Sequence, residues 1–176
     1  MDIPNSQREE NYQEYSRLLQ DPLYIDVIFD EESGGVSAIH KEHCFDKQKG
    51  PYGYARGQYE KDVAHILRKN GDCIILESEY PKGKGIKAFD ARLNGLATEI
   101  KTVESTGRWS VRTKIQEAIS QGAEILILYY PEKDFFSEDK IHEGWRICFA
   151  QAPSTPLQTI LVVMKEEGVK MLKPSG

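Results

Sequence analysis

The spacing of apolar residues divides the chain into helical and extended segments. Apolar side chains that recur every three or four residues indicate amphipathic helices, whereas short apolar or alternating runs indicate strands. Asp21-Pro22 and Asn70-Gly71 end two helical segments, because proline cannot continue a helix and glycine favours the position after its last turn. The pattern predicts helices over residues 7–20, 58–70, 108–121 and 135–150, and strands over 23–29, 35–40, 72–78, 124–130, 159–164 and 168–172.

Residues 89–101 carry the strongest local signal in the sequence. Two short alternating runs meet at Asn94-Gly95, the residue pair that most favours a two-residue β-hairpin turn. Side chains alternate between the two faces of a strand. The stretch therefore predicts a β-hairpin with Asp90, Arg92 and Asn94 on one face of its first strand.

The second strand of this hairpin carries the sequence Glu99-Ile100-Lys101. Alternation places Glu99 and Lys101 on one face and Ile100 on the other. Two carboxylates, from Asp90 and Glu99, beside an ammonium group suit a hard divalent cation and a phosphodiester. The alternative is a surface hairpin with ordinary cross-strand charge pairs.

Glu60 extends the apolar stripe of the helix predicted over residues 58–70. It lies four residues before Ala64 and seven before Leu67, so its carboxylate joins the face that is expected to be buried. A buried carboxylate needs a partner, and a metal site at the edge of a sheet would supply one. The alternative is an acid in the first turn, where the helix dipole favours negative charge.

The predicted order around these acids is helix, three strands, helix and strand, and it resembles the PD-(D/E)xK nuclease superfamily, the fold of restriction endonucleases. The residues that carry the resemblance are Glu60, Asp90 and Glu99-Ile100-Lys101. Phe89 precedes Asp90, so the strict Pro-Asp pair of the superfamily is absent. Gln121-Gly122-Ala123 adds a likeness to the C-terminal nuclease domains of contact-dependent inhibition (CdiA-type) toxins and to phage head-associated nucleases.

This resemblance, which covers about residues 54–165, implies a fold. The expected class is α/β (α+β), with a restriction-endonuclease-like αβββαβ core in which helices flank a mixed sheet. A helix and a hairpin extend the core at the N-terminus. We expect an N-terminal helical extension over residues 1–24 and a single nuclease domain over residues 25–176.

The resemblance also implies metal-dependent hydrolysis of phosphodiester bonds. Asp90, Glu99 and the backbone carbonyl of Ile100 would bind Mg²⁺ or Mn²⁺, and Glu60 would contact the ion directly or through water. Lys101 would orient the attacking water or offset the charge that develops on the phosphate. Glu60, Asp90, Glu99 and Lys101 are therefore the predicted catalytic residues.

Basic and polar side chains flank these residues on both sides. Contacts to the substrate are expected from the loop that holds Lys82 and Lys84, and from Arg112, Lys114 and Gln116 on the following helix. A solvated loop and a solvated helix face are the alternatives. The resemblance favours tRNA as substrate, with DNA as the alternative, and implies an immunity protein as partner. A catalytically inactive binding module and a different enzyme of similar topology are rival interpretations.

Composition narrows the class of protein without deciding its function. The chain has 176 residues, 39% hydrophobic and 29% charged, which is typical of a globular protein with one core. A net charge of −5 argues against broad affinity for nucleic acids. No membrane span, signal peptide or disulfide framework is indicated, and a cytoplasmic site of action is expected. His40, His43 and Cys44 match no established zinc spacing, so a polar loop or contacts to phosphate are expected there.

Overall fold

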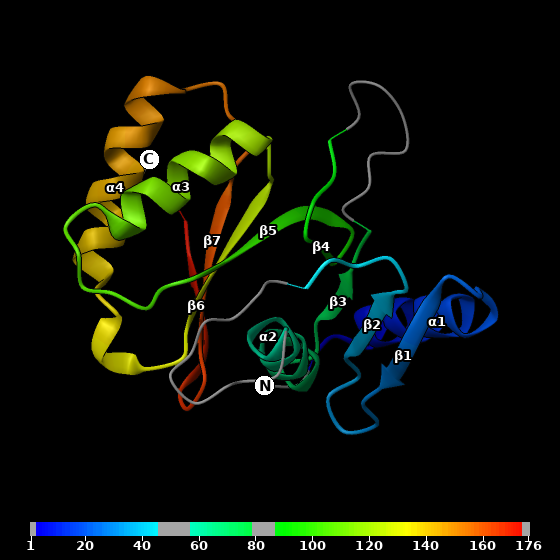
Figure 1. Cartoon of the computed structure of the whole chain (residues 1–176). Coiled ribbons are helices and arrows are strands. Elements are labelled where there is room, and N and C mark those ends of the chain that lie inside the picture. Colours follow the sequence, from blue (N-terminus) through cyan, green and yellow to red (C-terminus); the bar gives the residue numbers. More distant parts are fainter. Residues whose placement is uncertain (1–2, 46–56, 79–86, 174–176) are drawn as a thin grey trace. The chain divides into compact units, whose positions relative to one another are not determined.

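The computed structural model of the chain describes residues 3–45, 57–78 and 87–173. The chain forms two compact units, residues 1–95 and 96–176 (Figure 1). Among the described residues, each unit has four strands and two α-helices, and the second also has a short 3₁₀ helix, η1 (Lys133–Phe135). The α/β class with mixed sheets and flanking helices is confirmed.

The first unit is a four-stranded sheet between two helices. In chain order it contains α1 (Asn5–Gln20), β1 (Tyr24–Phe29), β2 (Val36–His40), α2 (Gln58–Lys69), β3 (Cys73–Leu76) and β4 (Ala91–Leu93). The strands follow the order β1-β2-β3-β4, with β2 and β3 parallel and the two outer pairs antiparallel. The predicted N-terminal helix and hairpin are α1, β1 and β2, and the hairpin belongs to the same sheet as β3.

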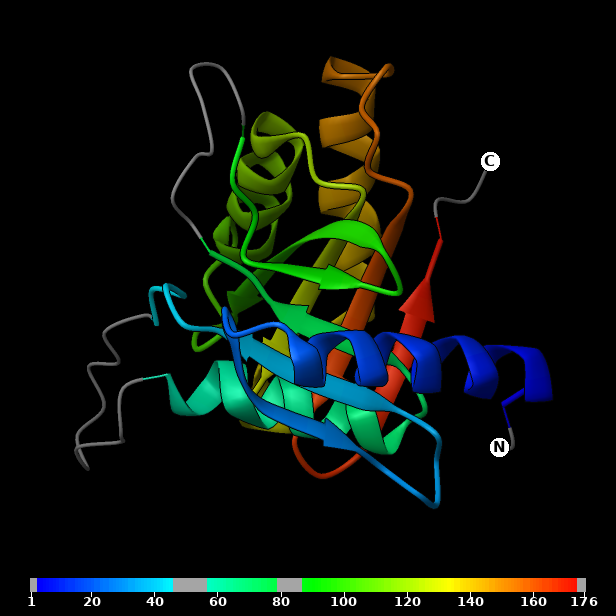
Figure 2. The same cartoon turned by 90° about the vertical axis from the view of Figure 1, so that its right-hand side faces the viewer.

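Helices α1 and α2 cover opposite faces of this sheet (Figure 2). Leu18 of α1 packs on Val36 and Ala38, whereas Ser37, between them on β2, accepts a hydrogen bond from Arg68 of α2 at 2.6 Å. Neighbouring residues of a strand point to opposite faces. The alternation in β2 thus determines which helix each residue meets.

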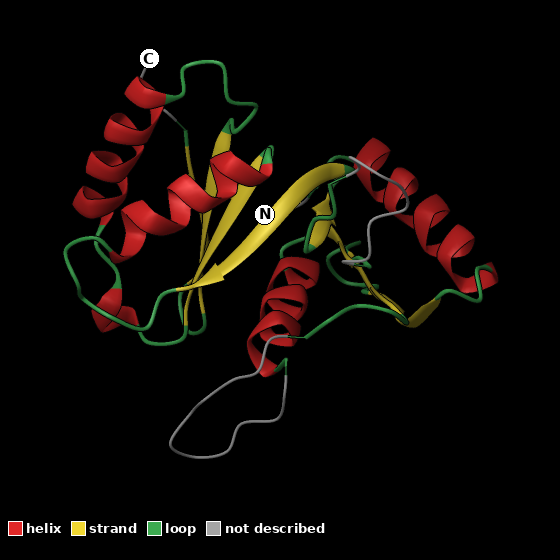
Figure 3. Ribbon diagram, turned by 45° about the horizontal axis from the view of Figure 1, so that its top comes forward, coloured by secondary structure: helices red, strands yellow, loops and turns green. Residues whose placement is uncertain are grey.

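The second unit continues the order that the sequence predicts. It contains β5 (Leu96–Thr102), α3 (Ser110–Gln121), β6 (Ile125–Tyr130), α4 (Glu138–Gln151), β7 (Thr159–Met164) and β8 (Gly168–Leu172) (Figure 3). Strands β5, β6 and β7 are parallel, and β8 pairs antiparallel with β7. The order α2, β3, β4, β5, α3, β6 is the predicted αβββαβ succession.

Several element boundaries differ from the prediction by one to three residues. The helix expected from residue 135 begins at Glu138, because the Ser137 side chain caps it by accepting a hydrogen bond from the Lys140 amide. The helix expected from residue 108 begins at Ser110, after a turn. The strand expected over 72–78 is limited to β3, residues 73–76.

Asn94 and Gly95 occupy the sharp turn between β4 and β5. Both have positive φ angles, 49° and 85°, as the favoured two-residue turn requires. Asn94 also makes two hydrogen bonds to Cys73 of β3. The backbone N–H of Asn94 donates to the Cys73 carbonyl at 2.8 Å, and the side-chain oxygen of Asn94 accepts from the backbone N–H of Cys73 at 2.9 Å. The turn residue that the sequence singles out therefore also anchors β4 to its neighbour. No helix among the described residues is long and apolar enough to cross a membrane.

Candidate active site

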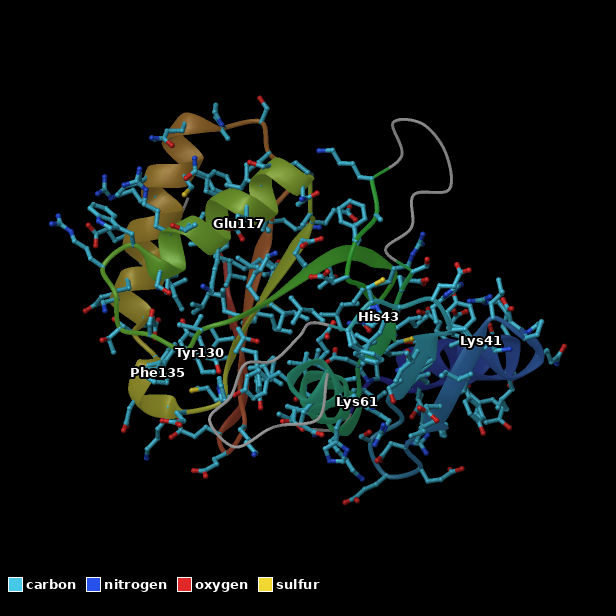
Figure 4. All side chains as sticks on the ribbon, viewed as in Figure 1. Lys41, His43, Lys61, Glu117, Tyr130 and Phe135 are labelled. Atoms are coloured by element: carbon cyan, nitrogen blue, oxygen red, sulfur yellow. The ribbon has the colours of Figure 1, made fainter. Side chains whose placement is uncertain are left out.

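Glu60 is buried at the first turn of α2, as its place on the apolar stripe predicts. Its side chain is 8% exposed, and its Oε1 lies 2.8 Å from Nε2 of His43. The other ring nitrogen of His43, Nδ1, lies 2.6 Å from the backbone carbonyl of Glu77 at the end of β3. Figure 4 shows His43 among the side chains around α2 and β3. The partner that a buried carboxylate requires thus comes from the chain itself.

Hydrogen-bond geometry constrains the protons on the pair formed by His43 and Glu60. A carbonyl oxygen only accepts hydrogen bonds, so Nδ1 of His43 carries a proton. One further proton lies between Nε2 and the Glu60 carboxyl group. The zero exposure of the His43 side chain argues against the expected contact to phosphate.

Glu77 joins a second polar group in the first unit that the sequence analysis did not identify. Tyr24 of β1 donates its hydroxyl to the Glu77 carboxylate at 3.0 Å, and Nε of Arg92 lies 3.7 Å from the same group. Burial, and then the Glu77 charge, raise the pKa of Tyr24 to about 12. The three side chains line a groove of about 390 Å³. The backbone links this group to Asp90, whose carbonyl accepts from the Glu77 amide at 3.0 Å.

Glu99 and Lys101 lie together on β5 in the second unit, as their spacing predicts. Nζ of Lys101 is 3.6 Å from a carboxylate oxygen of Glu99 and 3.7 Å from one of Glu117 on α3. Glu99 is only 6% exposed, whereas Lys101 and Glu117 are more open to solvent. Burying a carboxylate is costly unless it is paired. Lys101 supplies that pairing, and Glu117 is a neighbour that the sequence analysis missed.

The predicted site residues are divided between the two units, and two of the predicted residues lie outside the described part of the chain. Glu60 and Asp90 belong to the first unit, and Glu99, Ile100 and Lys101 to the second; that the two groups meet in one site stays a prediction. Arg112, Lys114 and Gln116 lie on α3 and reach solvent at least in part. Lys82 and Lys84 lie outside the described residues.

The described residues offer only a limited set of donors for the implied divalent cation. No three His, Cys, Asp or Glu side chains of that part of the chain are grouped closely enough to hold a metal ion. Mg²⁺, however, is commonly held by one or two carboxylates together with water and substrate phosphates, not by an all-protein cage. Carboxylates such as Asp90 and Glu99 fit that mode of binding, and a caged zinc site is not supported. Nδ1 of His40 accepts a hydrogen bond from the backbone amide of Glu42, so this ring nitrogen has a partner within the chain.

Comparisons with known proteins extend this picture at the level of the fold. No family model matches the sequence, and no curated protein matches it. The structure is similar to a chain of the "CdiA-CT/CdiI toxin and immunity complex from Burkholderia pseudomallei", with a TM-score of 0.50 and 18% identity. The match covers 78% of this chain and 99% of that one. This likeness supports a shared fold.

Proposed function

We propose that the chain is a metal-dependent nuclease that acts as a toxin domain. The observation that carries the proposal is the buried Glu99 beside Lys101 on β5, at 3.6 Å. A carboxylate held in an apolar sheet next to an ammonium group costs free energy that a structural residue would avoid. Such pairs occur where a site must bind a cation and stabilise negative charge.

The roles follow from the chemistry of each group. Asp90, Glu99 and the Ile100 carbonyl would hold Mg²⁺ or Mn²⁺, and the ion would polarise the phosphate and acidify a bound water. Lys101 places a positive charge where negative charge develops on the phosphate. Glu60, positioned by His43, would contact the ion directly or through water. The proposal requires Asp90 and Glu99 to share one cation.

The toxin assignment draws on the fold shared with a chain of the toxin and immunity complex. On this proposal the domain cleaves nucleic acid in the cytoplasm of a target cell, with tRNA as the favoured substrate and DNA as the alternative. The producing cell would then need an immunity protein to cover the site. A catalytically inactive binding module of the same fold is the rival interpretation.

The experiment compares cleavage and metal binding in the same variants. Purified protein is incubated with total tRNA or plasmid DNA, with Mg²⁺ or with EDTA, and Mn²⁺ affinity is measured by calorimetry. We expect Lys101→Ala to lower cleavage about 100-fold or more, with Mn²⁺ affinity unchanged or higher. Asp90→Ala should lose both, because the site gives up one of its few carboxylates.

Lys133→Ala is the matched control, since Lys133 is 65% exposed in the same unit as Lys101 and outside the proposed machinery. It should cleave like the wild type. Mn²⁺ affinity that is equal in the wild type and in Asp90→Ala would remove Asp90 as a ligand. A wild-type protein that neither binds Mn²⁺ nor cleaves either substrate would identify an inactive module.

A further inference from the structure

Trp109 is a large aromatic side chain left open to solvent directly before α3. It is 52% exposed, whereas the other tryptophan of the chain, Trp145, is 3% exposed. Exposing an indole forgoes the free energy of burying it. An exposed tryptophan that two charged side chains hold in place is a feature of binding surfaces.

Two arginines lie against this ring. The guanidinium carbon of Arg108 is 4.6 Å from the centre of the Trp109 ring, and that of Arg112 is 5.2 Å away. Neither arginine forms an ion pair with an acidic side chain among the described residues. In a chain of net charge −5, two neighbouring guanidinium groups without an acidic partner are available to bind an external anion.

The loop that carries Trp109 is tied to the second unit. Nζ of Lys140, on α4, donates to the Thr106 carbonyl at 2.7 Å. This contact brings a third positive charge to the loop. At the other end, the Trp109 carbonyl accepts from the Thr113 amide in the first turn of α3. The ring is therefore presented on an anchored backbone.

We propose that Trp109, Arg108 and Arg112 form a stacking site for an unpaired nucleobase of single-stranded nucleic acid. The ring stacks on the base, and the guanidinium groups bind the flanking phosphates, as in other single-strand binding surfaces. A duplex offers the same phosphates, but its bases are already stacked on one another. The site therefore selects single strands.

The place of this site on α3 connects it to the proposed nuclease function, on which the assignment of a nucleic acid rests. Glu117, whose carboxylate lies 3.7 Å from Lys101, is on α3, eight residues after Trp109, which directly precedes that helix. Eight residues of helix span about 12 Å. A few nucleotides of extended strand bridge that distance, so a strand stacked on Trp109 also reaches Lys101.

The fluorescence of Trp109 itself reports binding at this site. In the variant Trp145→Phe, Trp109 is the remaining tryptophan, so the tryptophan emission comes from this site. The change removes no hydrogen bond, because the buried Trp145 Nε1 has no partner among the described residues. Titration with a ten-nucleotide oligouridine in EDTA should quench this emission by roughly half. A ten-base-pair RNA duplex and heparin, which present charge without free bases, should leave it nearly unchanged. In the wild-type protein the same quenching should appear above a constant signal from Trp145.

Variants separate the ring from the charge. Trp109→Ala should weaken binding of the single strand about tenfold or more, whereas Trp109→Phe, which retains an aromatic face, should stay within about threefold. Arg108→Ala combined with Arg112→Ala should weaken single strand, duplex and heparin alike and flatten the salt dependence. Affinities are measured by anisotropy of a labelled oligonucleotide, so they do not depend on the tryptophan signal.

Three results would overturn the inference. These are equal quenching by duplex and single strand, wild-type affinity in Trp109→Ala, and quenching by polyglutamate, which would assign the surface to an acidic protein. EDTA separates this test from that of the nuclease. Quenching without any cleavage in Mg²⁺ would refute the enzyme and keep the stacking site, whereas cleavage without quenching would do the reverse.

Discussion

At the scale of single residues, the buried acids differ in how the fold neutralises them. Glu60 faces a histidine ring at 2.8 Å, whereas Glu99 faces the ammonium of Lys101 at 3.6 Å. His43 bridges two groups, the Glu60 carboxyl group and the Glu77 carbonyl. Its ring therefore determines where the Glu60 carboxyl group points, and it acts as a positioning residue.

Replacing His43 by glutamine or by asparagine, which both carry a side-chain amide, tests that role. His43→Gln keeps an N–H donor near the position of Nε2, toward Glu60, while His43→Asn keeps one near Nδ1, toward the Glu77 carbonyl. Both should lose stability by a similar amount, about 1–3 kcal/mol, because each gives up one of the two hydrogen bonds made by the buried ring. Only His43→Asn should weaken Mn²⁺ binding about tenfold or more, since Glu60 then loses its orienting partner.

Calorimetric Mn²⁺ titrations and urea unfolding of both variants provide the measurements. Equal metal affinity in the two variants would reduce His43 to a structural residue. A wild-type protein that binds no Mn²⁺ would instead refute the proposed function, so the two failures remain distinct.

At the scale of secondary-structure elements, Asp30 joins the turn after β1 to the end of α2. Its carboxylate accepts from the Ser33 amide at 2.8 Å and lies 2.5 Å from Nζ of Lys69. The hydrogen bond from Lys69, followed by that from Ser33, holds the pKa of Asp30 far below its ordinary value of 3.8. The folded state therefore favours the ionised form of this carboxyl group.

The pH dependence of stability follows from the sign of that shift. A lowered pKa adds stability above the ordinary value, and this stability is lost as the pH falls toward the folded-state value. At pH 7, Asp30→Asn should cost about 1 kcal/mol and Asp30→Ala about 2 kcal/mol, because only asparagine keeps an acceptor for Ser33. At pH 3, just below the ordinary value, the cost of Asp30→Asn should be smaller than at pH 7 but still measurable, because the folded-state pKa lies lower still. Urea unfolding followed by circular dichroism at both pH values measures this, and an equal cost at both would contradict the assigned ion pair.

At the scale of the whole molecule, the expected single domain over residues 25–176 is open to a direct test. The two compact units are joined in the chain between Gly95 and Leu96, directly after the turn that connects β4 to β5. Both tryptophans, Trp109 and Trp145, belong to the second unit. Tryptophan fluorescence therefore reports unfolding of the second unit alone.

Asp30→Ala lies in the first unit, so its effect on that fluorescence measures coupling. If the chain unfolds as one domain, the variant should lower the urea midpoint of the fluorescence transition as much as that of circular dichroism. Tyr130→Ala, a cavity-forming change in the second unit, is the reciprocal control and should shift both probes. An unchanged fluorescence midpoint in Asp30→Ala would show that the units unfold independently.

The sequence determined the helices and strands of this protein because the interactions that specify them are local. Apolar period, the Asp21-Pro22 stop and the Asn94-Gly95 turn act within a few residues, so helices and strands lie within about three residues of their predicted bounds. The same locality placed Glu60 on a buried face of α2 and put Glu99 and Lys101 together on β5. Each of these inferences needs only the geometry of one helix or one strand.

Only the tertiary structure determined which charged and polar side chains pair with one another. Residue pairs that meet across the fold are separated by 17 positions for His43 and Glu60, 16 for Lys101 and Glu117, and 39 for Asp30 and Lys69. No periodic pattern specifies such pairs, because each depends on how a helix is seated on a sheet. A buried charge signals that it needs a partner, but packing determines which side chain supplies it.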